Sequence, residues 1–263
     1  MPVLPQVAGF DYHDVTDDPT CSGFQHRGAL AYKLTHRAFA AHLDGIATGP
    51  VAPTRLPDID FTRPGRHVLL TFDDGGKSAL YTSEELCRRG WRGNFFVVSS
   101  LIGTTAFLSA ADLRHLVRCG HIVGSHSHTH PHIFRDLAPQ RMLEEWRVSC
   151  DTISQIIGAP CLTAAVPGGD ISPAVIASAP RAGVRLLLTS EPWLTPHRVD
   201  GCWVLGRYAP KVNTSAQRVA ELAQFRGWTS ARLVYWLKAL GRAGLPWLYR
   251  HHVRRTTREA RVF

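Results

Sequence analysis

Several features that define particular classes of protein are missing from this chain of 263 residues. No uninterrupted apolar run approaches the ~20 residues that a membrane-spanning helix needs. The N-terminal sequence MPVLPQVAGFDYHDV has no basic region followed by a long apolar stretch, so we see no secretion signal. A content of 44% hydrophobic and 19% charged residues excludes a disordered chain. We therefore expect a globular protein in the cytoplasm, where it either stays in solution or lies at the inner membrane surface.

Cysteine pairs of the C-x-x-C type are also absent. The six cysteines are scattered along the chain at positions Cys21, Cys87, Cys119, Cys150, Cys161 and Cys202. This spacing excludes a zinc ribbon and a small disulfide scaffold. We expect reduced, mostly buried thiols, although their even number leaves disulfides open if another route exports the chain.

Acidic residues are nearly missing from the C-terminal segment. From Arg226 to Phe263, nine Lys or Arg residues accompany the single acid Glu259, so this segment carries +8 of the net charge of +9. The rest of the chain is close to neutral. Because a nucleic-acid-binding fold spreads its basic residues over a whole face, we predict no nucleic-acid partner.

Strand-like apolar runs alternate with helical stretches, which predicts an α/β fold with a parallel sheet, either a barrel or an open sheet. The predicted strands are His67 to Phe72, Asn94 to Val98, His121 to Ser125, Leu162 to Val166, Val184 to Thr189 and Cys202 to Tyr208. The predicted crossover helices are Ser78 to Arg89, Ala110 to Cys119, Pro139 to Ile157 and Ser172 to Ala182. In such folds the functional site lies at the carboxyl ends of the strands.

The chain divides into three parts by composition. Residues 1–66 form a lead-in that contributes to the barrel, with an apolar piece from Val7 to Tyr12 and a helix from His36 to Ile46. Residues 67–210 form the core. Residues 211–263 form a basic helical tail, which Pro246 breaks into two helices.

Two adjacent acids, Asp73 and Asp74, end the first predicted core strand in the sequence HVLLTFDDGG. Two carboxylates side by side at a buried strand end are costly unless a cation or a shared proton compensates them. The pair therefore indicates a metal or acid/base site, unless it only caps the following helix.

A histidine cluster follows another predicted strand in the sequence GHIVGSHSHTHPH. His126 and His130 are four residues apart, and neutral imidazoles at that spacing can bind one cation. Alone, the cluster is typical of a solvated loop. Together with the aspartate pair it predicts a site of two histidines and one carboxylate with an open position for water.

The third motif, AAVPGGD, places Pro167, Gly168 and Gly169 after a predicted strand. Proline and two glycines favour a turn whose backbone N–H groups approach a ligand closely, which is typical of an oxyanion hole. The same residues also suit a plain connection between a strand and a helix.

The motifs TFDDGG, GSHSHTHP and VPGG, in this order, resemble those of the polysaccharide deacetylases, carbohydrate esterase family 4. The resemblance spans about His67 to Tyr208. It implies a distorted (β/α)7-type barrel, one divalent metal ion and the removal of N- or O-acetyl groups from glycans. By the same resemblance, Asp74, His126 and His130 are the metal ligands and Asp73 is the general base.

Physical chemistry agrees with this division of roles. A bound metal lowers the pKa of its water, Asp73 accepts the proton, and the water attacks the acetyl carbonyl. The N–H group of Gly168 or Gly169 then stabilises the oxyanion. Zinc is the default metal for a mixed His/Asp ligand set, and cobalt and manganese also fit.

The sequence departs from the family pattern at two places. An arginine that usually orients the base is replaced by Ala165, and the usual late Leu-x-Leu-His motif for the general acid has no good match. Relatives that deacetylate poly-N-acetylglucosamine place this histidine before the aspartate pair. GFDYHDV offers His13 in that setting, so we predict His13 as the general acid, with Asp14 orienting it, unless His13 has no role.

Two further segments, TSEPW with LGRY and SGFQHRGALAYKL, resemble a subgroup associated with bacterial exopolysaccharide synthesis. Glu191 and Arg207 in the first segment are predicted to form an ion pair at the strand ends, which either replaces the work of the missing arginine or is only structural. The expected substrate is an acetylated exopolysaccharide or its lipid-linked precursor.

The basic tail alternates arginines with aromatic and aliphatic residues from Trp228 to Tyr249. This pattern suits an amphipathic helix pair on an anionic membrane surface, or a pair whose aromatic residues pack on the barrel. The oligomeric state is not predictable. Two other functions remain open at this point: an amidohydrolase of small cyclic amides or ureides on the same fold, and a glycan-binding or assembly protein without turnover.

Overall fold

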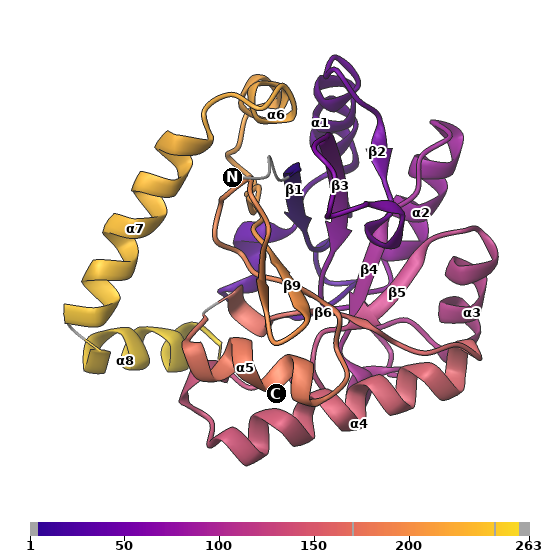
Figure 1. Ribbon diagram of the computed structural model, residues 1–263. Coiled ribbons are helices and arrows are strands. Elements are labelled where there is room, and N and C mark those ends of the chain that lie inside the picture. The colour runs from indigo at the N-terminus through magenta and orange to yellow at the C-terminus, as the bar shows by residue number, and fades with distance from the viewer. Residues whose placement is uncertain (1–4, 170, 245, 258–263) are drawn as a thin grey trace.

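A largely parallel sheet that curls into a partial barrel forms the centre of the molecule (Figure 1). The computed structural model describes residues 5–169, 171–244 and 246–257. Seven parallel strands follow one another in the order β1-β3-β4-β5-β6-β7-β9. The predicted (β/α) barrel class is confirmed. Residue 245 and residues 258–263 of the predicted tail, and residues 1–4 of the lead-in, lie outside the described ranges.

The strands are β1 (Gln6–Tyr12), β2 (Pro53–Thr54), β3 (Arg66–Phe72), β4 (Asn94–Val97), β5 (Ile122–Ser125), β6 (Thr163–Ala165), β7 (Leu186–Leu188), β8 (His197–Val199) and β9 (Cys202–Leu205). The short strand β2 also pairs with β3, and β8 is antiparallel to β9. The helices are α1 (His36–Ala47), α2 (Ala79–Arg88), α3 (Ala110–Arg118), α4 (Pro139–Ile157), α5 (Pro173–Arg181), α6 (Ala216–Ala223), α7 (Trp228–Gly244) and α8 (Pro246–Thr256). Short 3₁₀ turns include Ala29–Tyr32, Leu56–Asp58, Ser99–Leu101, Phe134–Asp136 and Pro167–Gly169.

The lead-in supplies a full barrel strand. β1 pairs with β3 along its whole length, from Gln6 opposite Arg66 to Tyr12 opposite Phe72. On its other side, the N–H of Asp11 donates to the carbonyl of Tyr208, and the N–H of Tyr208 donates to the carbonyl of Gly9, both at 2.8 Å. The chain after β9 therefore returns to β1 and brings the two ends of the curled sheet together.

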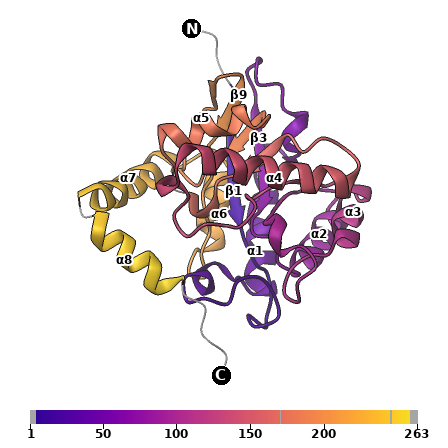
Figure 2. The same ribbon diagram turned by 90° about the horizontal axis from the view of Figure 1, so that it is seen from below.

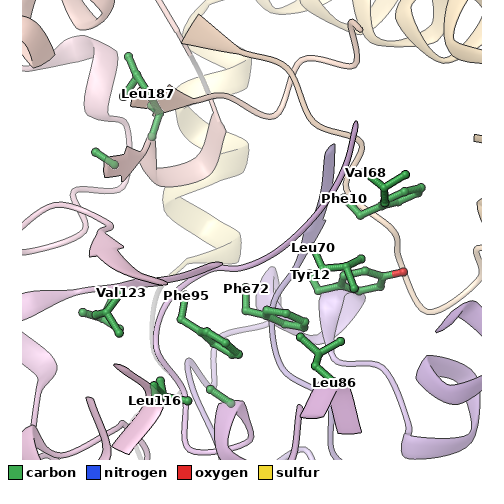
Figure 3. Packing of buried hydrophobic residues seen from close by; sticks show 14 of the residues in the cluster. Phe10, Tyr12, Val68, Leu70, Phe72, Leu86, Phe95, Leu116, Val123 and Leu187 are labelled. Atoms are coloured by element: carbon green, nitrogen blue, oxygen red, sulfur yellow. The ribbon is translucent and has the colours of Figure 1, made fainter. Parts of the chain in front are cut away.

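Alternation along β1 and β3 separates an outer from an inner layer. Phe10, Tyr12, Leu70 and Phe72 belong to the large apolar cluster that the sheet shares with its covering helices (Figure 3). Val7 and Leu69, one residue out of phase, belong to a second, smaller cluster together with Phe96, Leu188 and Leu205 from three other strands. Because the side-chain period of a strand is two, Asp11 and Thr71 lie on this second face.

The sequence predicted most elements within a few residues. All six predicted strands and all four crossover helices are present, and the helix expected from His36 to Ile46 is α1. The predicted strand from Cys202 to Tyr208 is shorter, since β9 ends at Leu205. Strands β2 and β8 and helix α6 were not predicted, because two or three residues of strand and eight of helix give too short a periodic signal.

Pro246 divides the C-terminal segment into α7 and α8, as predicted. These two helices lie together on one side of the barrel in both views (Figures 1 and 2). α8 is held at two points. Near its middle, Arg250 forms an ion pair with Asp136, with Nε 2.8 Å from Oδ2, and at its end the carbonyl of Thr256 accepts the N–H of Gly28 at 3.0 Å. Within the described residues, no helix combines the length and the hydropathy that a bilayer crossing requires.

None of the six cysteines forms a disulfide, and all six belong to the described residues. Cys150, Cys161 and Cys202 are buried, whereas Cys21 is exposed. The expectation of mostly buried thiols therefore holds for three of the six.

Candidate functional site

The predicted site residues gather at the carboxyl ends of the barrel strands. Asp73 and Asp74 follow β3, His126 follows β5, and Arg207 follows β9. His13 lies one residue beyond the end of β1. The parallel sheet therefore brings side chains together that are as much as 194 positions apart in the sequence.

Asp74, His126 and His130 form the first cluster. Oδ1 of Asp74 lies 3.4 Å from Nε2 of His126 and 3.5 Å from Nε2 of His130. Two ligands of a tetrahedral ion that each lie about 2.1 Å from it are about 3.4 Å apart. Asp74 Oδ1 is buried and has no hydrogen-bond partner, although such atoms are rarely left unpaired. The spacing and the orphaned oxygen both fit a shared cation.

Burial and neighbouring charges shift the pKa values of all three residues. Burial lowers the pKa of His130 to about 4, so its imidazole is neutral at neutral pH. Burial raises the pKa of Asp74, but the larger, opposite effect of His126, His13 and His130 brings this pKa below its usual value. The carboxylate is therefore ionised. Burial lowers the pKa of His126, but Asp73 and Asp74 raise it above its usual value. Nδ1 of His126 lies 2.9 Å from the carbonyl oxygen of Ala165, and this contact directs Nε2 toward Asp74.

Backbone conformation also marks this site. Asp74 (φ 74°) and His130 (φ 50°) are non-glycine residues in the left-handed region. This backbone conformation costs free energy, and residues that adopt it cluster at functional sites. Gly75 (φ 79°) follows Asp74, and a Cβ atom there would lie 2.8 Å from Cγ1 of Val97. Glycine is therefore required next to Asp74.

Glu145 of α4 fixes the histidine loop. This buried carboxylate accepts the N–H of His128 at 3.0 Å and of Thr129 at 2.7 Å, as well as the hydroxyl of Thr129 at 2.7 Å. Nδ1 of His128 lies 2.9 Å from Oγ of Ser99. His128 therefore has its own partner, and the loop presents His126 and His130 to Asp74.

Asp73 is paired with Arg207 in a bidentate contact. Nη1 and Nη2 of Arg207 donate to Oδ1 and Oδ2 of Asp73, each at 2.8 Å, and both side chains are buried. Burial raises the pKa of Asp73, but Arg207 and His126 lower it below its usual value. Asp73 is therefore held as an oriented carboxylate, and the guanidinium comes from the end of β9 and not from position 165.

Asp11 is a further buried acid at this site. Its Oδ1 lies 3.3 Å from Nη1 of Arg207 and 4.0 Å from Nδ1 of His13, and its Oδ2 accepts the hydroxyl of Ser190 at 2.6 Å. Ligand atoms of Asp11, His13 and Asp73 all lie within 4.8 Å of one another. Burial raises the pKa of Asp11 to about 6, against the opposing effect of Arg207.

The predicted partner of His13 lies elsewhere. Asp14 does not orient His13, because its carboxylate accepts the hydroxyls of Ser22 and Ser78 and lies 3.7 Å from Nζ of Lys33. The acid beside His13 is Asp11.

The predicted ion pair between Glu191 and Arg207 is replaced by another arrangement. Among the described residues, the ion pairs of the Arg207 side chain are with Asp73 and Asp11. Glu191 contributes its backbone carbonyl, which accepts the N–H of Arg207 at 3.0 Å. The guanidinium of Arg207 therefore lies between Asp73 and Asp11, beside the carboxyl ends of β3 and β1.

The turn from Pro167 to Gly169 lies beside these clusters. The N–H of Gly169 donates to the carbonyl of Val166 at 2.9 Å, so this group is already used within the turn. Gly169 (φ 63°) packs so closely that a Cβ atom would lie 2.3 Å from Cβ of Ser190. The candidate oxyanion donor is therefore Gly168, next to buried Pro167.

Two cavities open at this end of the barrel, and both are lined by Gly168 and Tyr32. The first has a volume of 680 Å³ and reaches two members of the first cluster, Asp74 and His130, with further lining residues His13, Phe24, Tyr249, Val253 and Thr256. The second has a volume of 610 Å³ and is lined by residues that include Arg207, Tyr208, Ser190, Ala231 and Tyr235. α8 therefore forms part of the wall of the first cavity, and α7 part of the wall of the second.

Sequence reasoning missed Asp11 and Glu145. A signal for Asp11 exists, because Phe10 and Tyr12 alternate with Asp11 and His13, which places the two polar side chains on one face of a strand. Glu145 gives no such signal: it lies in the middle of an amphipathic helix, where a glutamate normally faces water.

Comparison with known families identifies the class. Residues 61–187 match the model of the polysaccharide deacetylase family. These residues therefore form a polysaccharide deacetylase domain, which agrees with the family predicted from the motifs. A search of the curated proteins finds no match.

Solved structures share the fold. BC0361, a polysaccharide deacetylase from Bacillus cereus, is 17% identical with a TM-score of 0.71, over 84% of this chain and 69% of that one. IcaB from Ammonifex degensii is 22% identical with a TM-score of 0.68, over 83% and 97%. The deacetylase domain of BpsB from Bordetella bronchiseptica is 18% identical with a TM-score of 0.58, over 78% and 97%. At these identities the likeness is one of fold.

Proposed function

We propose that this protein is a metal-dependent deacetylase that hydrolyses acetyl groups of an N- or O-acetylated polysaccharide. The family match supports hydrolysis of acetylated glycans. The observation that carries the metal dependence is the cluster of Asp74, His126 and His130 around one orphaned carboxylate oxygen. Within this class, the resemblance of the TSEPW and LGRY segments favours a bacterial exopolysaccharide or its lipid-linked precursor.

Asp74, His126 and His130 would hold the divalent ion, with zinc as the first choice and cobalt or manganese as alternatives. Such an ion lowers the pKa of a bound water and polarises the acetyl carbonyl. Asp74 contributes the negative charge, and the Ala165 carbonyl orients His126 through Nδ1, so that Nε2 faces Asp74. The protein thereby offers two imidazole nitrogens and one carboxylate to a doubly charged ion.

Asp73 acts as the general base. Its ionised carboxylate accepts the proton of the attacking water, and lone pairs remain for this because each oxygen uses only one in its bond to Arg207. Arg207 restricts the rotation of the carboxylate. The lowered pKa keeps Asp73 deprotonated at neutral pH, before each turnover.

His13 acts as the general acid for the leaving amine or alcohol. Its ring lines the cavity of the metal cluster, and 22% of its side-chain surface is exposed, so it can reach a bound substrate. Nδ1 of His13 is buried without a hydrogen-bond partner and faces Oδ1 of Asp11, which also lacks a partner, at 4.0 Å. Closure of this gap to hydrogen-bonding distance would orient His13 and stabilise its protonated form.

The N–H of Gly168 supports the oxyanion, since this residue lines the metal cavity. The cavity volume of 680 Å³ lies within the range of about 300–1,000 Å³ that small-molecule sites occupy. Phe24, Tyr32 and Tyr249 line it with aromatic rings, which suit the apolar faces of sugar rings. A glycan chain therefore fits this cavity better than a small polar molecule does.

Release of acetate from acetylated glucosamine oligomers in the presence of zinc tests this function. We expect wild-type protein to release acetate, Asp73→Asn to lose activity by at least about a hundredfold with its zinc content unchanged, and Asp74→Asn to lose both. His13→Ala is expected to lower kcat with zinc content retained. If several acetylated glycans and metals give no acetate release, the proposed function is wrong; if His13→Ala is fully active, only the acid assignment is wrong.

A further inference from the structure

An uncovered apolar stripe runs along the outer side of α7. Its members recur at the i, i+3, i+4, i+7 spacing of one helix face: Leu233, Trp236, Leu237 and Leu240. Their exposed fractions are 57%, 58%, 58% and 49%. Trp247 and Leu248 at the start of α8, at 67% and 46%, are also exposed. We call these six residues the outer stripe.

The opposite side of α7 already packs on the barrel. Trp228 and Ala231 are buried, and the ring of Trp228 contacts Phe10 of β1 edge to face, with centroids 6.4 Å apart. Nε1 of Trp228 donates to the carbonyl of Leu222 at 2.9 Å. The first turn of α7 is thus docked on the barrel, and the outer stripe remains available for a partner.

The charge of the surrounding segment selects the kind of partner. Residues 226–263 carry nine basic residues and one acid, and among them Arg232 and Arg255 are exposed. A second copy of the chain would bring an equal excess of positive charge to the contact, which disfavours self-association. An anionic lipid surface offers opposite charge and an apolar interior together.

We propose that the outer stripe docks this protein on an anionic membrane surface. Leucine side chains enter the boundary between headgroups and acyl chains, Trp236 and Trp247 lie at the interface where tryptophan is favoured, and the basic side chains meet the headgroups. The inner sides of α7 and α8 line the two cavities, so docking places the glycan cleft next to the lipid. The proposal concerns binding and does not depend on the reaction.

Flotation with vesicles tests this proposal. Full-length protein is mixed with vesicles of phosphatidylcholine alone or with about 30% phosphatidylglycerol, and the bound fraction is measured. We expect binding to the anionic vesicles, weaker binding at high salt, and a blue shift of tryptophan fluorescence on binding. The double variant Trp236→Gln/Leu237→Gln is expected to lower the partition coefficient at least about tenfold.

The matched control is Leu162→Gln, since Leu162 is 46% exposed and directly precedes β6, outside the tail. Its partition coefficient is expected to stay at the wild-type value. Acetate release from a soluble oligomer, followed on the same variants, should not change, so loss of docking is distinguished from loss of the enzyme. Equal partition coefficients for the double variant and wild type overturn the proposal. It is also overturned if wild type does not bind vesicles but sediments as a dimer, and the double variant sediments as a monomer.

Discussion

At the scale of single residues, the site depends on charges that are buried together. Arg207 is fully buried between Asp73 and Asp11, and its guanidinium also donates to the hydroxyl of Thr71 at 2.8 Å. Removal of one member of such a cluster leaves another charge buried without compensation, which typically costs about 3–5 kcal/mol. The arginine therefore both stabilises the barrel and positions Asp73, the proposed base.

Arg207→Lys tests the positioning role. A lysine keeps the charge but cannot form two parallel bonds to one carboxylate, so we expect kcat to fall by about ten- to a hundredfold with a smaller change in KM. Steady-state kinetics with an acetylated oligomer measure this split. Arg198→Lys is the control, because Arg198 is exposed on β8 and is expected to keep wild-type kinetics. A wild-type kcat for Arg207→Lys would contradict the role.

Asp11 should make stability depend on pH. Its pKa is raised to about 6 in the folded protein from an ordinary value of 3.8, so the folded state holds a proton that the unfolded state releases. Between about pH 4 and pH 6 this group therefore lowers the unfolding free energy as pH rises, by up to about 3 kcal/mol. Asp11→Asn is expected to remove this decline. Denaturant unfolding at several pH values measures it, and parallel pH profiles for variant and wild type would exclude it.

At the scale of elements, local patterns and distant contacts differ in how far the sequence predicts them. The core strands and helices were predictable because apolar periodicity is local, and the ligand loop because its histidines lie within five residues. The pairing of Asp73 with Arg207 was not predictable, because Arg207 is 134 positions away and reaches Asp73 only when the chain after β9 returns to β1. Asp14 misled the prediction, since proximity in sequence to His13 does not place it on the same face.

Helix α8 is an element whose role follows only from tertiary structure. Tyr249, Val253 and Thr256 recur on its inner side and line the cavity of the metal cluster. The tail is therefore part of the proposed glycan site, besides any contact on its outer side.

Val253→Trp tests this role of α8. The larger side chain narrows the cavity, so we expect KM for an acetylated oligomer to rise at least about fivefold, with little change in kcat for a small acetyl ester. His252→Trp is the matched control, since the neighbouring side chain is exposed. Equal KM values for the two variants would show that glycans bind away from α8.

At the scale of the whole molecule, the barrel and the metal cluster depend on each other. Asp74 comes from the end of β3, and His126 from the end of β5, with β4 between them. An ion that binds only the folded arrangement stabilises the fold by mass action. Removal of metal by a chelator is therefore expected to lower the melting temperature by several degrees, while the Asp74→Asn variant should show no such response.

The most direct measurement of the central claim is a zinc titration of the metal-free protein, in which bound zinc and acetate release are followed on the same samples. The account predicts that activity rises in proportion to bound zinc and saturates at one ion per chain, and that His126→Ala and His130→Ala neither bind that ion nor release acetate. Full acetate release by the metal-free protein, or by either histidine variant, would contradict it.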